Sequence, residues 1–162
     1  MKKINYQPKF VFASLVLLCI VLFSFTLKTA ETIFGGEGFE VYLNNKLVLQ
    51  QFGKSMDVVK TVQLDQSTGN GELAIRYFHC GQPGKSRTVT IRDEQNVVLK
   101  QWKFGDTKDA SAKLCCNVKD ILALPKLKTG KKVNLYYSSA ELPNGRLLAV
   151  LSAAGKHIAA QP

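Results

Sequence analysis

The chain has 162 residues, of which 46% are hydrophobic and 21% charged, and its formal net charge is +10 at pH 7. This composition excludes a disordered or fibrous protein and indicates one globular domain. The basic residues are scattered, and their densest stretch is Lys126, Lys128, Lys131 and Lys132. Because a nucleic-acid-binding protein gathers basic residues on one face with aromatics among them, we expect no nucleic-acid partner. A solvated basic surface, or one weakly attracted to anionic lipid or polysaccharide, fits better.

The first 30 residues have the layout of an export segment. Lys2, Lys3 and Lys9 precede an apolar run at residues 10–27. Such a run is long enough either for a signal peptide, cut after Ala30, or for an N-terminal membrane anchor that contacts the bilayer when it is not cleaved. We therefore expect an exported protein that is periplasmic, outer-envelope or secreted, and tethered to the inner membrane where the segment is retained.

A glycine-rich linker, residues 31–38, leads into a series of short strands. Phe39, Val41 and Leu43 alternate with polar or aromatic neighbours, as in a half-buried strand. Asn44-Asn45 then supplies two residues that tolerate positive φ, and an apolar-rich stretch follows at residues 46–52. This pattern predicts a β-hairpin.

Further strands are expected at regular spacing along the chain. They cover residues 57–64, 72–78, 87–93, 97–104, 132–137 and 146–152. A change of parity in the stretch at residues 97–104 predicts a bulge near Lys100 or Gln101. Residues 117–124 fit a short helix capped by Asn117 and ended by Pro125, although a strand fits almost as well. We expect residues 153–162 to form a loosely ordered tail.

These elements predict an all-β fold: an antiparallel β-sandwich of Greek-key or jelly-roll type over residues 39–152, preceded by an N-terminal hydrophobic export helix. Cys80, Trp102 and Cys115 follow the order seen in immunoglobulin domains. However, Trp102 lies too close to the second cysteine, and Phe78 stands where such domains have a tyrosine. The cysteine and tryptophan pattern therefore does not identify that family.

Three cysteines lie in the exported part of the chain: Cys80, Cys115 and Cys116. An oxidising compartment favours disulfides, so we expect one bridge from Cys80 to Cys115 or Cys116. It would close a loop of about 36 residues and stabilise the fold by at most about 4 kcal/mol. Because successive residues of a strand point to opposite faces, only one of the adjacent pair can face Cys80.

The same residues could serve two other chemistries. His79 and Cys80, opposite Cys115 and Cys116, would suit a soft metal such as Cu(I) or Zn(II). The spacing lacks the C-x-x-C pattern, so we expect no metal and no cofactor. A cysteine nucleophile activated by His79 is also disfavoured, since adjacent residues point apart on an extended chain. No catalytic residue is predicted.

Aromatic residues are the remaining candidates for a binding surface. Most should belong to the core or to cross-strand pairs, but Tyr42, Tyr136 and Trp102 are candidates for an exposed surface. Exposed aromatics on a sheet stack on sugars or anchor a protein partner.

The sequence thus predicts an exported envelope module with a non-catalytic binding or structural role, whose partner is an envelope protein or a glycan. The first alternative is a thiol-based metal-handling or redox-sensitive protein built on His79, Cys80, Cys115 and Cys116. The second is a hydrolase whose residues the sequence does not reveal.

Overall fold

The computed structural model describes residues 36–65 and 70–154, which belong to one compact unit comprising residues 34–162. The apolar run at residues 10–27, the start of the linker and the tail from residue 155 lie outside these residues. Within the described ranges, no helix has the length and apolar character needed to cross a membrane.

Strands dominate the described residues. In chain order the elements are β1 (Gly38–Leu43), β2 (Lys46–Phe52), η1 (Gly53–Asp57), β3 (Lys60–Leu64), β4 (Glu72–Phe78), β5 (Thr88–Arg92), β6 (Val98–Lys103), β7 (Leu114–Asn117), α2 (Val118–Leu122), α3 (Pro125–Lys128), β8 (Val133–Ser138) and β9 (Arg146–Ala153). The prediction of an all-β fold is confirmed.

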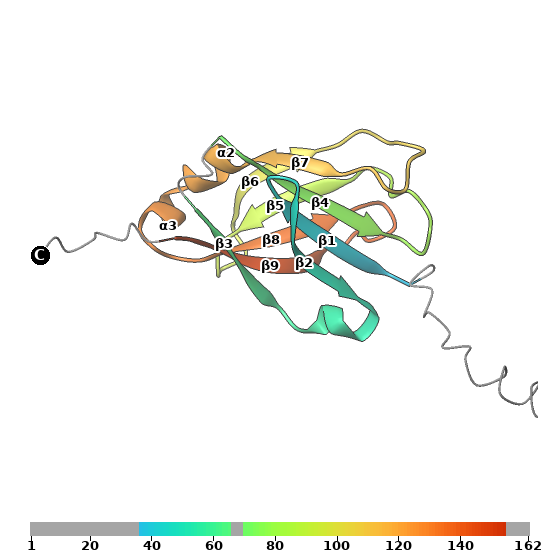
Figure 1. The fold of residues 1–162 in the computed structure, drawn as a ribbon, viewed down its shortest axis with the longest axis horizontal. Coiled ribbons are helices and arrows are strands. Elements are labelled where there is room, and N and C mark those ends of the chain that lie inside the picture. Colours follow the sequence, from blue (N-terminus) through green and yellow to red (C-terminus); the bar gives the residue numbers. More distant parts are fainter. Residues whose placement is uncertain (1–35, 66–69, 155–162) are drawn as a thin grey trace, which may run out of the picture. The chain divides into compact units, whose positions relative to one another are not determined.

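The strands form two sheets (Figure 1). The first has the order β2-β1-β4-β7 and is antiparallel throughout. The second has the order β3-β9-β8-β5-β6, in which β3 runs parallel to β9 and the other pairs are antiparallel. The expectation of purely antiparallel sheets is therefore wrong at β3. After β2 the chain leaves the first sheet through η1, and β3 then lies at the edge of the second sheet, beside β9. No hairpin connects β3 to β9, so the pair need not be antiparallel.

Local signals account for much of this arrangement. Asn44 and Asn45 both have positive φ, of 52° and 63°, and they close the hairpin of β1 and β2. The side chain of Asn117 accepts a hydrogen bond from the Lys119 N–H and caps α2, as predicted. The predicted end at Pro125 is wrong, because α2 ends at Leu122 and Pro125 begins α3.

Two further differences concern strand limits. The strand expected from residue 57 starts only at Lys60, because residues 53–57 form the 3-10 turn η1. The register between β5 and β6 pairs Ile91 with Lys100 and Arg92 with Val98. Leu99 is thus the extra residue of the bulge, one position before the predicted one.

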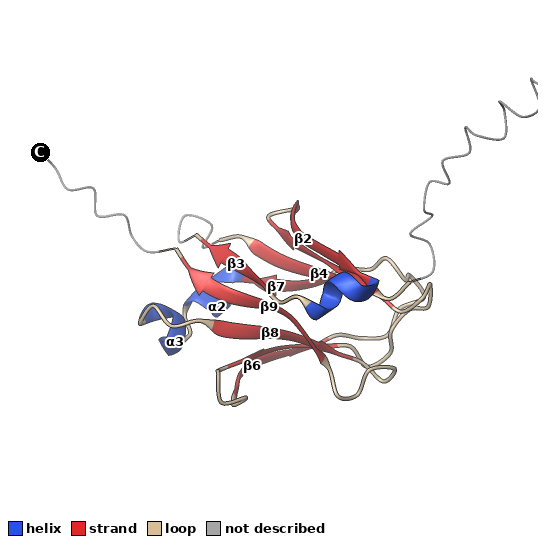
Figure 2. Ribbon diagram, turned by 90° about the horizontal axis from the view of Figure 1, so that it is seen from below, coloured by secondary structure: helices blue, strands red, loops and turns tan. Residues whose placement is uncertain are grey.

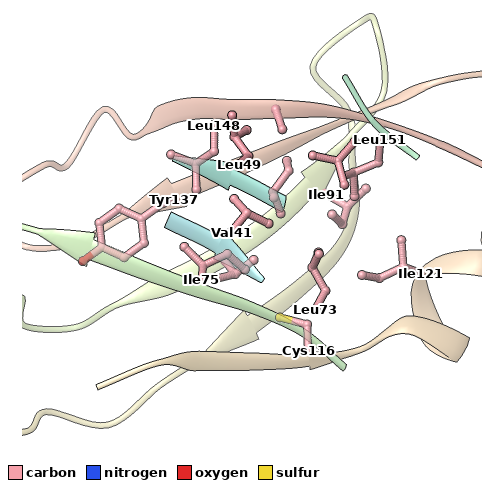
Figure 3. Packing of buried hydrophobic residues seen from close by; sticks show 14 of the residues in the cluster. Val41, Leu49, Leu73, Ile75, Ile91, Cys116, Ile121, Tyr137, Leu148 and Leu151 are labelled. Atoms are coloured by element: carbon pink, nitrogen blue, oxygen red, sulfur yellow. The ribbon is translucent and has the colours of Figure 1, made fainter. Parts of the chain in front are cut away.

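The two sheets lie one against the other (Figure 2), and one hydrophobic core lies between them (Figure 3). The first sheet contributes Phe39, Val41, Leu73 and Ile75, all with 0% exposure. The second contributes other fully or almost fully buried residues, including Val89, Ile91, Leu135, Tyr137, Leu148 and Leu151. Val118, Ile121 and Leu127 turn the apolar sides of α2 and α3 into the same core.

The unit has two ends with different contents. β4 runs from Glu72, which pairs with Asn117, to Phe78, which pairs with Gly38. A strand of this length spans about 20 Å. The start of β1 therefore lies at one end of the sheet, and α2 and α3 lie at the other (Figure 1).

Truncation of a core leucine tests the packing. Leu135 is 0% exposed and Leu47 is 42% exposed. We expect Leu135→Ala to lower the free energy of unfolding by about 2–5 kcal/mol, because it leaves a cavity. Leu47→Ala should change it by about 0.5 kcal/mol or less. Urea denaturation measures both, and equal losses would contradict the described core.

Candidate functional site

The cysteines do not meet in this structure. Cys80, Cys115 and Cys116 are all free thiols. Cys115 pairs with Ala74 on β4, and β4 runs on to Phe78, about 13 Å further at 3.3 Å per residue. A disulfide requires Cα atoms within about 7 Å, so the expected bridge from Cys80 to Cys115 or Cys116 is not formed and does not fit this register.

Cys80 instead lies at the tip of a tight turn. Cys80 and Gly81 have φ values of 51° and 84°, and the Gln82 N–H donates to the His79 carbonyl at 3.0 Å. Two successive residues with positive φ are typical of a type I′ turn. The turn exposes Cys80, whereas Cys116 points into the core (Figure 3) and Cys115 faces outward. The adjacent pair thus faces opposite sides, as predicted.

The environments of Cys115 and Cys116 do not favour thiolate chemistry. Burial, with help from Glu72, raises the pKa of Cys115 to about 11. Burial raises the pKa of the Cys116 thiol to about 12. Both groups are protonated at neutral pH, and the thiolate is the form that binds metals or attacks substrates. Among the described residues, no group of three or more His, Cys, Asp or Glu side chains could hold a metal ion.

Tyr42 lies on the outer face of the first sheet, in a polar network. Its hydroxyl donates to Glu40 at 2.7 Å, and Glu40 also accepts from Gln50 at 2.9 Å and pairs with Arg76 at 3.5 Å. The Lys113 ammonium lies 3.8 Å from the centre of the Tyr42 ring. A cation therefore covers the face of this aromatic ring.

A cationic side chain also lies over the ring of each of the other two aromatic candidates. The Arg92 guanidinium lies 4.6 Å from the centre of the Tyr136 ring, and the Lys100 ammonium lies 5.7 Å from that of Trp102. Trp102 pairs with the core residue Val89 and packs against the core, so it is only partly exposed. Of the three predicted surface aromatics, Tyr42 and Tyr136 lie on outer faces and Trp102 lies on the core side.

A cluster that sequence reasoning missed closes the end of the core next to the start of β1. Tyr77 on β4 and Tyr137 on β8 stack across the two sheets, with ring centres 4.4 Å apart and planes 12° apart. His79 packs against both rings at 4.7 and 5.6 Å. We call Tyr77, His79, Tyr137 and Ser139 the His79 cluster.

Hydrogen bonds link the members of the His79 cluster. The His79 Nε2 lies 2.8 Å from the Tyr137 hydroxyl and 3.3 Å from the Ser139 hydroxyl. Ser139 Oγ also accepts from the Leu142 N–H at 3.2 Å. The Tyr77 hydroxyl donates to Glu37, which pairs with Arg146 at 3.3 Å. Burial raises the pKa of both tyrosines, so both hydroxyls stay protonated.

This arrangement places a serine beside a histidine, the pair that a hydrolase uses. Ser139 is only 5% exposed and Tyr137 only 1%. A hollow beside the cluster is lined by Tyr77, Gly84, Arg87, Asp109, Ala110, Ala112, Leu114 and Tyr137, and neither His79 nor Ser139 lines it. The geometry therefore fits closure of the core better than attack on a substrate.

The opposite end carries the densest basic stretch. The loop after α3 and the turn between β5 and β6 face each other across a groove lined by Asp93, Glu94, Gln95, Lys126, Gly130, Lys131 and Lys132. Lys126 pairs with Asp93 at 3.5 Å. Asp93 also accepts from the Gln95 and Val97 N–H groups, and these bonds outweigh burial and lower its pKa.

Comparisons with known proteins give no further information on the function of either end. No protein-family model matches the chain, and no curated protein matches it. The candidate sites therefore rest on the geometry alone.

Gly84 tests the packing of the His79 cluster. A Cβ atom at this position would lie 2.6 Å from the Tyr137 hydroxyl and 2.8 Å from the His79 Nε2, whereas one at Gly105 meets nothing within 4 Å. We expect Gly84→Ala to cost about 1–3 kcal/mol of stability through overpacking, with Gly105→Ala within about 0.5 kcal/mol of wild type. Chemical denaturation compares the two, and an unchanged Gly84→Ala variant would contradict the packing described.

Titration of His79 gives stability a pH dependence. Burial holds the pKa of His79 below its ordinary value, Arg87 adds to the shift, and Glu141 and Glu37 oppose it. The unfolded chain therefore binds a proton first, near pH 6.5, as pH falls. We expect wild type to lose stability relative to His79→Gln between about pH 6.5 and the lower pKa of the folded state. A difference between the two that stays constant from pH 8 to pH 5 would contradict this expectation.

Proposed function

We propose that this chain is an exported β-sandwich module of the cell envelope with a non-catalytic binding role, and that its partner is a protein or a glycan. The export part of the proposal rests on Lys2, Lys3, Lys9 and the apolar run at residues 10–27. The module is periplasmic, outer-envelope or secreted, and it is tethered to the inner membrane where that run is retained.

We further propose that the sandwich is a Greek key with immunoglobulin-like strand order. In that order β1, β4 and β7 correspond to strands A, B and E, and β5, β6, β8 and β9 correspond to C, C′, F and G. The two central strands that a disulfide joins in antibody domains are here β4 and β8. Their connection is the stacked pair Tyr77 and Tyr137. This correspondence concerns fold and by itself implies no function.

The observation that carries the non-catalytic role is the closure of the His79 cluster. Its serine and histidine are adjacent, as the hydrolase alternative requires, but Ser139 is 5% exposed and lines no described groove. A catalytic nucleophile must reach its substrate, so this pair supports a structural role.

The thiol alternative is weaker on the same geometric grounds. Cys80 and Cys115 are held apart by the length of β4, and the pKa values of Cys115 and Cys116 are raised. A redox or metal site needs thiolates that converge on one point.

The cations over the outer aromatic rings bear on which kind of partner can bind there. A neutral sugar stacks on an open aromatic face, but Lys113 covers Tyr42 and Arg92 covers Tyr136. Such a sugar would have to displace a cation that already interacts with the ring. The surroundings of these two outer aromatic rings are thus charged, and they favour a partner recognised by charge.

Labelling of Cys80 in cells tests the export. We expect a membrane-impermeant maleimide to label this exposed thiol while the inner membrane is intact. Cys80→Ser should remove most of the label, because the raised pKa values of Cys115 and Cys116 leave little thiolate at pH 7. Labelling that appears only after the inner membrane is lysed would show a cytoplasmic protein and contradict the proposal.

A further inference from the structure

The lysines in and after α3 form a surface whose positive charges are mostly not paired with acidic residues of the described fold. We call Lys126, Lys128, Lys131 and Lys132 the lysine surface. Lys128, Lys131 and Lys132 are exposed, and none of them forms an ion pair with a described residue. Lys126 is partly used, through its pair with Asp93. Three positive charges that have no ion-pair partner in the described part of the chain thus lie within five residues.

The acidic groups nearby are largely occupied. Asp93 is 6% exposed and is held by two N–H groups and Lys126. Asp120 pairs with Lys100 at 3.5 Å. Glu94 is exposed on the facing turn and lines the same groove. The surface therefore keeps an excess of positive charge that an external anion can neutralise.

The chemistry of the surface favours a polyanion over an acidic protein. All four positive residues are lysines, and lysine is depleted from protein–protein interfaces whereas arginine is enriched. A lysine ammonium is a compact point charge that suits single oxyanions such as phosphate. Lys131 and Lys132 line the groove, and Lys128 lies three residues before Lys131 in the chain. Such a set of neighbouring positive charges suits a chain with repeated anionic groups.

The position of the surface argues against a bilayer. The apolar residues Val118, Ile121 and Leu127 of α2 and α3 are buried in the core, with 2% exposure or less, so these helices offer no apolar face to lipid.

We infer that the lysine surface docks an anionic polysaccharide of the envelope, in the groove between the β5–β6 turn and the loop after α3. This inference rests on the proposed binding role and names the chemistry of the partner. Binding is electrostatic, so it weakens with added salt.

The test uses the full chain in non-ionic detergent, with phosphorylated dextran as the probe and unmodified dextran as its neutral counterpart. We expect wild type to bind only the phosphorylated form at low salt. The triple variant Lys128→Gln, Lys131→Gln, Lys132→Gln should lose about tenfold or more in affinity. Glu94→Gln should bind more tightly than wild type, because it removes a repelling charge from the groove.

A matched control separates this surface from net charge. Lys54, Lys60 and Lys103 are also exposed and lie elsewhere on the unit. Their triple change to Gln removes the same charge and should lower the affinity less than about threefold. Equal losses in the two triple variants would overturn the inference, because binding would then follow net charge alone.

Two other outcomes would also overturn it. Binding to poly-L-glutamate but not to phosphorylated dextran would assign the surface to an acidic polypeptide. If wild type binds neither probe while Cys80 is still labelled from outside the inner membrane, the exported location stands and this partner class is wrong.

Discussion

The stack of Tyr77 on Tyr137 is the contact on which one end of the structure depends. The two rings come from central strands of the two sheets, and their centres lie 4.4 Å apart. His79 packs on both rings, and Gly84, which has no side chain, leaves the space that they need. Aromatic stacking and a hydrogen bond to His79 therefore connect the two sheets at this end. The core is therefore closed at this end by a contact that does not involve Cys80, Cys115 or Cys116.

The two ends of the unit differ in whether their polar and charged groups have partners within the structure. At the His79 cluster the polar groups satisfy one another, and Ser139 and Tyr137 are almost fully buried. At the lysine surface three ammonium groups have no ionic partner among the described residues, and a groove lies beside them. Unsatisfied charge at a surface is available for a partner, whereas a satisfied buried network mainly stabilises the fold.

Sequence patterns predicted what is local and missed what is long-range. The alternation in β4, the Asn44-Asn45 turn and the Asn117 cap all depend on neighbouring residues, and all are confirmed. The parallel pairing of β3 with β9 depends on strands far apart in the chain. The sequence patterns did not predict β7, which is only four residues long and too short to show a clear alternation. The meeting of His79 with Tyr137, 58 positions later, leaves no signal in either stretch. The bridge expected from Cys80 is not formed in this structure, because the pairing of cysteines depends on strand register rather than on cysteine count.

Hydrogen exchange of the full chain, with and without phosphorylated dextran, tests this division between the two ends most directly. The proposed docking at the lysine surface predicts that the polymer slows amide exchange at residues 126–132 and 94–97 and leaves residues 79–86 and 139–145 unchanged. Slowed exchange confined to the segments around His79 and Ser139 would instead place the binding site at the cluster that we describe as structural. That result would contradict the account.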